Sequence, residues 1–190
     1  MALPLLISVP HAGLDVPDEV QDRCILSHED IVKDGDEGAA AIFWPLAPHV
    51  EGFITTDIAR AIVDLNRAEE DFRKDGVIKT HTCWDVPVYS EYPPPELIET
   101  LLERYHRPYH RRLTELAASG VRMGIDCHTM AAEGPPVGPD QGQPRPPACL
   151  GDGEELTCPT PWRDQLVTRF REAFGEHPVT VNDPFAGGFI

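Results

Sequence analysis

The sequence predicts a single domain with an α/β fold, and three observations lead to this prediction. Short apolar segments bounded by glycine or proline, the pattern of buried strands, occur at several points of the chain. Segments with apolar residues at three- and four-residue steps, the pattern of amphipathic helices, lie between them. No internal repeat and no change of composition marks a boundary. We therefore expect one α/β domain over residues 1–190, long enough for a sizeable core.

The composition is that of a globular protein with a strong negative charge. Hydrophobic residues make up 41% of the chain and charged residues 25%, and the formal net charge is −16. This charge excludes nucleic acids and anionic membranes as favoured partners. We expect no membrane span, and the N-terminal segment lacks the basic start and cleavage site of a signal peptide. The five cysteines form no CxxC pair, which predicts reduced thiols and a cytoplasmic location.

The first part of the chain predicts one strand and several short helices. Residues 4–9 are an apolar segment typical of a strand, and His11 follows it closely. Residues 17–20 begin with a proline, which favours the first turn of a helix. Residues 27–30 combine a serine at the cap position with early acidic residues. Residues 39–46 carry an apolar helical pattern that stops near a proline.

The middle of the chain predicts further strands and the clearest helix. Residues 52–56 are β-rich, and the apolar residues of 58–65 predict another strand. Residues 68–90 show few periodic signals and are expected to form loops. Apolar residues then recur at helical spacing from 97 to 116. Pro108 lies inside this pattern, so we expect the helix to be kinked or split there.

The last third predicts a strand, a long loop, a helix and a final strand. Residues 123–127 are an apolar run after a glycine and indicate a buried strand. Residues 133–153 are rich in proline and glycine, and a loop of this length is usually functional or mobile. Residues 161–174 have an amphipathic helical pattern, and 177–181 predict a strand. A glycine-rich turn over 182–188 follows.

Two predicted strands are each followed by a histidine, which is the basis for a metal-site hypothesis. His11 and His128 stand at strand ends, where α/β sheets place their ligand crevices. Rigid backbone there can hold an imidazole for a metal ion. The alternative is a pair of core histidines satisfied by hydrogen bonds. Asp36 lies at or just before a predicted helix, where an acidic residue can also act as a cap.

Two other polar patterns point to structural or substrate contacts. Asn66 and Arg67 follow a predicted strand, and an arginine beside an asparagine can bind a carboxylate through a bidentate fork. The alternative is a solvated loop. His106 and His110 are four residues apart on a helix, but no HExxH glutamate lies between them. We therefore interpret this pair as structural or as support for nearby site residues.

The motifs stand in a fixed order along the chain: His11, Asp36, Arg60, Asp64-x-Asn66-Arg67, Tyr105-His106-x-x-Tyr109-His110, Asp126-x-His128 and Asn182-x-Pro184-Phe185-x-Gly187-Gly188. This ordered set resembles the N-formylglutamate amidohydrolase family, which is related to zinc carboxypeptidases and aspartoacylases. The resemblance runs from Val9 to Ile190. It implies a zinc-carboxypeptidase-like α/β fold with a mixed β-sheet flanked by helices and a single zinc ion. It also implies hydrolysis of a small anionic N-acyl amino acid, such as N-formylglutamate to formate and glutamate.

The resemblance assigns roles to the metal-site candidates. His11 and His128 match the two histidine ligands of the family. Asp36 matches the acidic residue before the helix and is the expected third ligand. Asp15 is the alternative, because in the wider carboxypeptidase group the acidic ligand closely follows the first histidine.

The resemblance also assigns the residues that would contact substrate. Asn66 and Arg67 match the pair that holds the substrate carboxylate, and Arg60 matches an arginine expected to face the scissile carbonyl or the substrate acid. Arg145 in the proline-rich loop and Asn182 in the final turn are further candidates for substrate binding. No prediction of the oligomeric state follows from these motifs.

The catalytic base is the position where this chain departs from the family pattern. Relatives carry a base glutamate on a strand that would begin near Ile190, where this sequence stops. Three alternatives follow: a domain without its C-terminal strand or strands, a substitute acid such as Glu133, or a metal- or ligand-binding relative with impaired catalysis. A zinc hydrolase for another N-acyl amino acid or peptide is a further alternative.

Overall fold

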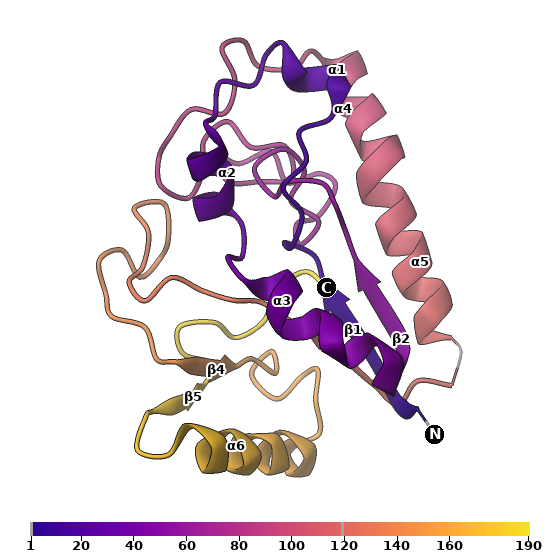
Figure 1. Cartoon of the computed structure of the whole chain (residues 1–190), viewed down its shortest axis with the longest axis vertical. Helices are drawn as coiled ribbons and strands as arrows, with labels where there is room; N and C mark the ends of the chain where they lie inside the picture. Colours follow the sequence, from indigo (N-terminus) through magenta and orange to yellow (C-terminus); the bar gives the residue numbers. More distant parts are fainter. Residues whose placement is uncertain (1, 119) are drawn as a thin grey trace. The chain divides into compact units, whose positions relative to one another are not determined.

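The computed structural model describes residues 2–118 and 120–190, which form two compact units (Figure 1). The first unit extends to Met130, and the second comprises Ala131–Ile190. Strands and helices alternate in both units, which confirms the α/β prediction. The description of residues 1–190 as a single domain stays a prediction.

The strands in each unit pair in parallel. In the first unit, β1 (Leu3–Val9) lies between β2 (Val50–Thr55) and β3 (Met123–Asp126). In the second, β4 (Ala148–Leu150) pairs with β5 (Val179–Val181). All pairings between these strands are parallel, so the mixed β-sheet that the family resemblance implies is not the sheet that the described residues form. Long connections that contain helices return the chain to the same end of the sheet, which parallel pairing requires.

Short helices fill the connection between β1 and β2, as the sequence predicts. The hydroxyl of Ser27 accepts a hydrogen bond from the backbone of Asp30, and the Asp30 carboxylate accepts one from the backbone of Ser27. This capping box fixes where the second helix begins. The elements are α1 (Asp18–Gln21), α2 (His28–Asp34), α3 (Ala39–Phe43) and the 3₁₀-helix η1 (Trp44–His49).

The helix around Pro108 continues through the proline instead of splitting. It consists of α4 (Pro95–Leu101), the π-helical turn η2 (Leu102–His106) and α5 (Arg107–Ala117). Proline has no N–H, and its ring would clash with the carbonyl four residues earlier in a regular α-helix. A wider π turn directly before Pro108 accommodates the ring while the helical path continues.

Alternation along β1 places a different helix on each of its faces. Ile7 and Val9 are buried in a cluster with Ala39 of α3. Ser8 points to the opposite face, where its hydroxyl lies 3.0 Å from the hydroxyl of Tyr109 on α5. Figure 1 shows α3 and α5 beside β1 and β2. The central strand is therefore covered on both faces, as strands in parallel sheets are.

The segment 58–65, which the sequence predicts to be a strand, forms a buried irregular turn. Gly13 and Asp15 pair with Ala59 and Ile58 only through isolated parallel bridges, and the chain then turns. A Cβ on Gly13 would lie 2.3 Å from the carbonyl carbon of Asp57, so only glycine allows this close approach. A continuous apolar run reports burial but does not specify strand geometry, which explains the wrong prediction.

The second unit contains one strand that the sequence does not predict. α6 (Thr160–Phe174) and β5 confirm the predicted helix and strand, and Val167 of α6 is buried. β4 lies within 133–153, a range expected to be loop. A three-residue strand is too short to give a periodic signal, and its pairing with β5 is set by tertiary structure.

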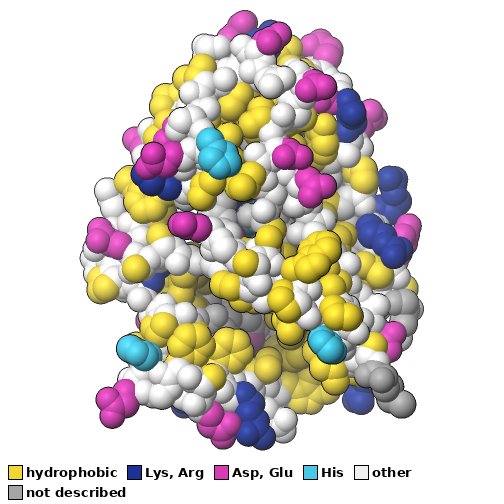
Figure 2. Space-filling model, viewed as in Figure 1, with side chains coloured by type: hydrophobic (Ala, Val, Ile, Leu, Met, Phe, Trp, Pro, Cys, Tyr) yellow, Lys and Arg dark blue, Asp and Glu magenta, His cyan; other side chains and the backbone are white. Residues whose placement is uncertain are grey.

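The surface carries many acidic side chains. Figure 2 shows them spread over the visible face instead of gathered in one patch.

All five cysteines are free thiols. Within residues 2–118 and 120–190, no helix is long and apolar enough to span a bilayer.

Candidate metal centre and active site

Three side chains from separate parts of the first unit meet at one edge of its sheet. His11 follows β1, and His128 lies two residues after β3. These strands are parallel neighbours, so their carboxyl ends lie at the same edge. Asp36, between α2 and α3, completes the group. One potential ligand atom from each of the three residues lies within 4.8 Å of the other two.

Asp36 faces the histidines and does not cap a helix. The N-cap of α3 is Gly38, with φ of 77° and no side-chain cap hydrogen bond. The Asp36 Oδ2 atom lies 2.8 Å from His128 Nδ1 and accepts the backbone N–H of Thr129 at 3.3 Å. Burial raises the pKa of Asp36, but interactions with His11 and His128 outweigh it and hold that pKa well below its usual range. Asp36 is therefore an anion between two imidazoles.

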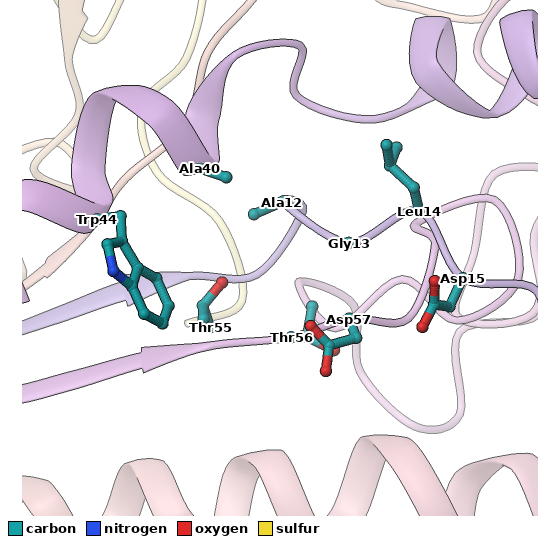
Figure 3. Close-up of a pocket in the computed structure, with 9 residues that line it drawn as sticks. All are labelled: Ala12, Gly13, Leu14, Asp15, Ala40, Trp44, Thr55, Thr56 and Asp57. Carbon is teal, nitrogen blue, oxygen red and sulfur yellow. The ribbon is translucent and has the colours of Figure 1, made fainter.

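Asp15, the alternative third ligand, lies outside this group. It is exposed and lines a surface hollow of about 240 Å³ (Figure 3). The side chains of Trp44 and Asp57 also line this hollow. Among the described residues, the group of potential ligands around His11 contains Asp36 and not Asp15. The geometry favours Asp36 as the acidic ligand.

Each histidine binds a second carboxylate through its Nε2 atom. His11 Nε2 lies 2.8 Å from Asp64 Oδ1, and His128 Nε2 lies 2.7 Å from Asp126 Oδ2. Both Nδ1 atoms are directed toward Asp36, at 3.5 Å from Oδ1 for His11 and 2.8 Å from Oδ2 for His128. A carboxylate behind the imidazole is the usual support of a histidine that binds a metal ion.

The two histidines differ in their exposure to solvent. The side chain of His11 is 3% exposed and that of His128 is 31% exposed. Burial lowers the pKa of His128, but hydrogen bonds with Asp126 and Asp36 outweigh it and raise this pKa to about 10. The centre is therefore closed on the side of His11 and accessible on the side of His128.

A buried ion network lies behind His11. Lys79, which is fully buried, contacts Asp34 Oδ2 at 2.9 Å and Asp64 Oδ2 at 3.5 Å. Arg60 donates its Nε–H to Asp64 Oδ2 at 3.0 Å and an Nη1–H to the carbonyl of Asp34. Burial raises the pKa of Asp64, but the nearby His11, Arg60 and Lys79 outweigh it and hold this pKa well below its usual value.

The residues present fit a divalent metal ion. Two imidazole nitrogens and a carboxylate oxygen are a donor set that zinc prefers. His11 Nδ1 is buried and makes no hydrogen bond within residues 2–118 and 120–190, although a carboxylate oxygen faces it. A bound metal ion would displace the proton that the raised pKa of His128 places on its ring. With both rings neutral, the cluster of four carboxylates and two cations then keeps two negative charges: Asp34, Asp36, Asp64, Asp126, Arg60 and Lys79.

The residues expected to bind substrate already have protein partners. Asn66 donates from Nδ2 to Asp126 Oδ2 at 3.1 Å, so it supports the carboxylate behind His128. Arg67 donates to the carbonyl oxygens of Asp75 and Asn66 and lies 3.5 Å from the Asp75 carboxylate. Its side chain is 24% exposed. Their roles in substrate binding stay predictions.

His106 and His110 anchor the segment that carries these residues. Their Nε2 atoms lie 2.9 Å from the carbonyl oxygens of Arg67 and Leu65, respectively. The rings pack together with their centroids 4.3 Å apart. These contacts show a structural role for the pair, which holds the backbone of residues 65–67, and its support of a substrate site stays a prediction.

The remaining candidates lie in the second unit. Arg145 forms a two-pronged ion pair with Asp140 at 2.7 and 2.9 Å. Asn182 exchanges hydrogen bonds with Asp152, whose backbone N–H it accepts and whose carboxylate it donates to. Glu133 is exposed. Catalysis by Glu133 and substrate binding by the other two stay predictions.

The sequence carries no direct signal for most of the residues that surround the histidines. Asp64 and Asp126 belong to sequence motifs that give them no role of their own, and no motif contains Asp34 or Lys79. One signal was present: Lys79 follows Val77 and Ile78 in a short apolar run. A lysine is almost never fully buried unless it is paired, so its position within a buried run indicates an ion pair.

The family comparison covers nearly the whole chain. A family model described as FGase, N-formylglutamate amidohydrolase, matches residues 3–190. The chain is also similar to an N-formylglutamate deformylase of Pseudomonas putida, with 27% identity over 200 residues. That alignment covers 99% of this chain and 73% of the relative.

Solved structures show the same fold. An N-formylglutamate amidohydrolase from Ralstonia eutropha JMP134 superposes with a TM-score of 0.81 at 22% identity, covering 98% of this chain and 74% of that one. A gene product of Agrobacterium tumefaciens superposes with a TM-score of 0.67 at 17% identity, covering 96% of this chain and 68% of that one.

Proposed function

This chain belongs to the N-formylglutamate amidohydrolase family, and on that premise we propose that it hydrolyses the amide bond of a small N-acyl amino acid. The first candidate is N-formylglutamate, which gives formate and glutamate. The observation that carries the proposal is the meeting of His11, Asp36 and His128 at the edge of the sheet. The likeness to the Pseudomonas putida deformylase supports the substrate class.

We propose that His11, Asp36 and His128 hold one zinc ion. Zinc bound there would act as a Lewis acid toward water and the amide carbonyl. Two features support a cation at this place: the buried Nδ1 of His11 makes no hydrogen bond to the described part of the chain, and the cluster keeps a residual negative charge. The histidines that follow parallel strands also support a relation to the zinc carboxypeptidases. The expected cytoplasmic location is consistent with five free thiols.

Cationic and amide side chains would orient the substrate. We assign Arg67 to the substrate carboxylate, with Asn66 beside it, because a guanidinium can bind a carboxylate through two parallel hydrogen bonds. Arg60 would stabilise negative charge that develops on the carbonyl oxygen. Arg145 and Asn182 would bind the remaining polar groups of the substrate. Glu133 would act as the base that takes a proton from water. A chain with net charge −16 needs such local cations for an anionic substrate.

The test is the release of formate from N-formyl-L-glutamate by the zinc-loaded protein. N-acetyl-L-glutamate tests the acyl group, and N-formyl-L-glutamine tests the need for the second carboxylate. We expect turnover of the first compound, and its loss in His128→Ala. His49→Ala is the matched control, because His49 is an exposed histidine of η1 outside the ligand group.

Each outcome of these assays supports or contradicts one part of the proposal. Turnover of N-acetyl-L-glutamate alone would support a zinc hydrolase but replace the formyl group by the acetyl group as the acyl group that is released. Zinc binding without turnover of any of the three compounds would contradict the proposed reaction for this chain. Equal turnover by His128→Ala and the parent protein would contradict the assignment of His128 to the active site.

A further inference from the structure

The surface hollow beside Asp15 has an apolar end and an acidic end. Its volume is about 240 Å³, and we call it the Trp44 hollow. Figure 3 shows Trp44, Ala40 and Ala12 toward one end of the hollow, and Asp15 and Asp57 toward the other. The remaining lining residues are Gly13, Leu14, Thr55 and Thr56.

The apolar end presents an aromatic side chain to solvent. Trp44 is 60% exposed, and its ring packs edge-on against Phe53 with the ring centroids 5.7 Å apart. One exposed tryptophan is ordinary on a protein surface. Here, however, the ring belongs to a hollow that Ala12, Ala40 and the exposed Leu14 also line. An apolar group that enters the hollow removes this surface from water, which favours binding.

The acidic end presents two carboxylates that have no cationic partner. Asp15 and Asp57 are exposed, and neither side chain forms an ion pair or a hydrogen bond within residues 2–118 and 120–190. The backbone brings the two residues together, because the Asp15 N–H donates to the Asp57 carbonyl at 2.8 Å. Two negative charges held in this way attract a cation more strongly than either does alone.

We propose that the Trp44 hollow binds a small primary amine with an apolar body. The ammonium group binds the carboxylates of Asp15 and Asp57, and the apolar body covers the Trp44 ring. An anionic N-acyl amino acid is repelled by these carboxylates, so the hollow takes a different class of ligand from the metal centre. The proposal requires neither zinc nor turnover and does not depend on the proposed function.

The first test compares two compounds that have the same chain length and differ in charge. n-Pentylamine is a cation at neutral pH, as the lysine side chain is, and n-pentanol is neutral. The indole N–H resonance of Trp44 in ¹H–¹⁵N spectra, assigned with Trp44→Phe, reports binding at constant ionic strength. We expect a saturable shift with n-pentylamine and a much smaller one with n-pentanol. An unmoved Trp44 resonance, or equal shifts with both compounds, would overturn the proposal.

Trp84 is an internal control in the same spectra. It is also exposed and also precedes an aspartate, but its indole N–H donates to the Lys33 carbonyl at 2.9 Å, and Asp85 pairs with Lys74. We expect the Trp84 resonance to stay in place. Equal shifts at Trp84 and Trp44 would indicate a general attraction of the amine to an acidic surface and would overturn the proposal.

The second test is the double variant Asp15→Asn/Asp57→Asn. We expect it to fold, because the contact between the two segments uses backbone atoms. The Kd for n-pentylamine should rise roughly 3- to 30-fold, since exposed ion pairs are individually weak. The matched control is Asp18→Asn/Asp22→Asn, which removes the same charge from exposed positions outside the hollow and should keep the parental Kd.

An equal Kd in the two double variants would contradict the role of the hollow's carboxylates and overturn the proposal. Should Asp15→Asn/Asp57→Asn fail to fold, the comparison of amine and alcohol on the unmutated protein decides the question.

Discussion

Ser8 of β1 lies directly opposite Asp126 of β3, and its hydroxyl donates to Asp126 Oδ1 at 2.7 Å. The other oxygen of Asp126 accepts from Asn66 and contacts His128 Nε2. Pairing of the two strands therefore orients the carboxylate that supports His128. The central strand contributes in this way to the second proposed histidine ligand as well as to His11.

We expect Asp126→Asn to lower zinc affinity by roughly 10- to 100-fold, because the carboxylate behind His128 is lost. Ser8→Ala removes only one hydrogen bond to that carboxylate and should cost about 1 kcal/mol of stability with a smaller loss of affinity. Chelator competition and urea unfolding measure the two effects. A larger affinity loss in Ser8→Ala than in Asp126→Asn would contradict this order.

Metal removal should abolish the proposed activity reversibly. We expect elemental analysis to find about one zinc per chain, since three ligands and one open position are the usual composition of a catalytic zinc site. Dialysis against a chelator should remove the metal and the turnover, and added zinc should restore both. Equal metal content in His128→Ala and His49→Ala would speak against the assigned ligands.

Arg67→Ala should raise KM for N-formyl-L-glutamate with little change in kcat. Loss of a charge-assisted contact costs about 2–3 kcal/mol, which corresponds to a roughly 30- to 150-fold rise in KM. Arg112→Ala is the control, because Arg112 is an exposed arginine of α5 that pairs with Glu115 on the same helix. If both variants kept the parental KM, Arg67 would not bind the substrate carboxylate.

Lys79→Met should destabilise the fold by about 3–5 kcal/mol, because it leaves the buried Asp34 carboxylate without its ammonium partner and Asp64 with Arg60 alone. Adding Asp34→Asn removes one of those charges, so the double variant should lose less stability than the sum of the single variants. Urea unfolding at neutral pH measures the free energies. Strictly additive losses would mean that Lys79 and Asp34 do not interact energetically.

His110 should make stability decrease as the pH falls below about 6.5. Burial and the neighbouring His106 lower its pKa from the ordinary value of 6.5. The unfolded chain therefore takes up a proton at a higher pH than the folded chain, and protonation favours unfolding. His110→Gln should show a smaller loss of stability between pH 7 and 5 in urea titrations. Parallel pH profiles of variant and parent would contradict this contribution.

The ligand group was predictable because it follows from strand ends. A histidine after each of two parallel strands must lie near the same edge of the sheet, whatever the details of the chain between them. The role of Asp36 was harder to predict, because an acidic residue before a helix can either cap the helix or face a ligand. Only the fold showed that Gly38 is the cap of α3 and that Asp36 faces His128.

The ion network could not be derived from the sequence for a different reason. Lys79 reaches Asp34 across 45 residues, and most of the segments between them are irregular. No periodic pattern predicts such a contact. The 58–65 prediction failed similarly, because the apolar run reports burial around Asp64 but not the turn that directs this carboxylate toward His11.

Gly13 holds the chain that follows His11 against the backbone of Asp57. The Asp15 N–H donates to the Asp57 carbonyl at 2.8 Å, and the Ala59 N–H donates to the Asp15 carbonyl at 2.9 Å. This segment is therefore ordered in the folded protein before any ligand arrives. The conformational entropy lost in fixing the His11 segment belongs to folding, and it does not reduce the affinity for a metal ion or substrate.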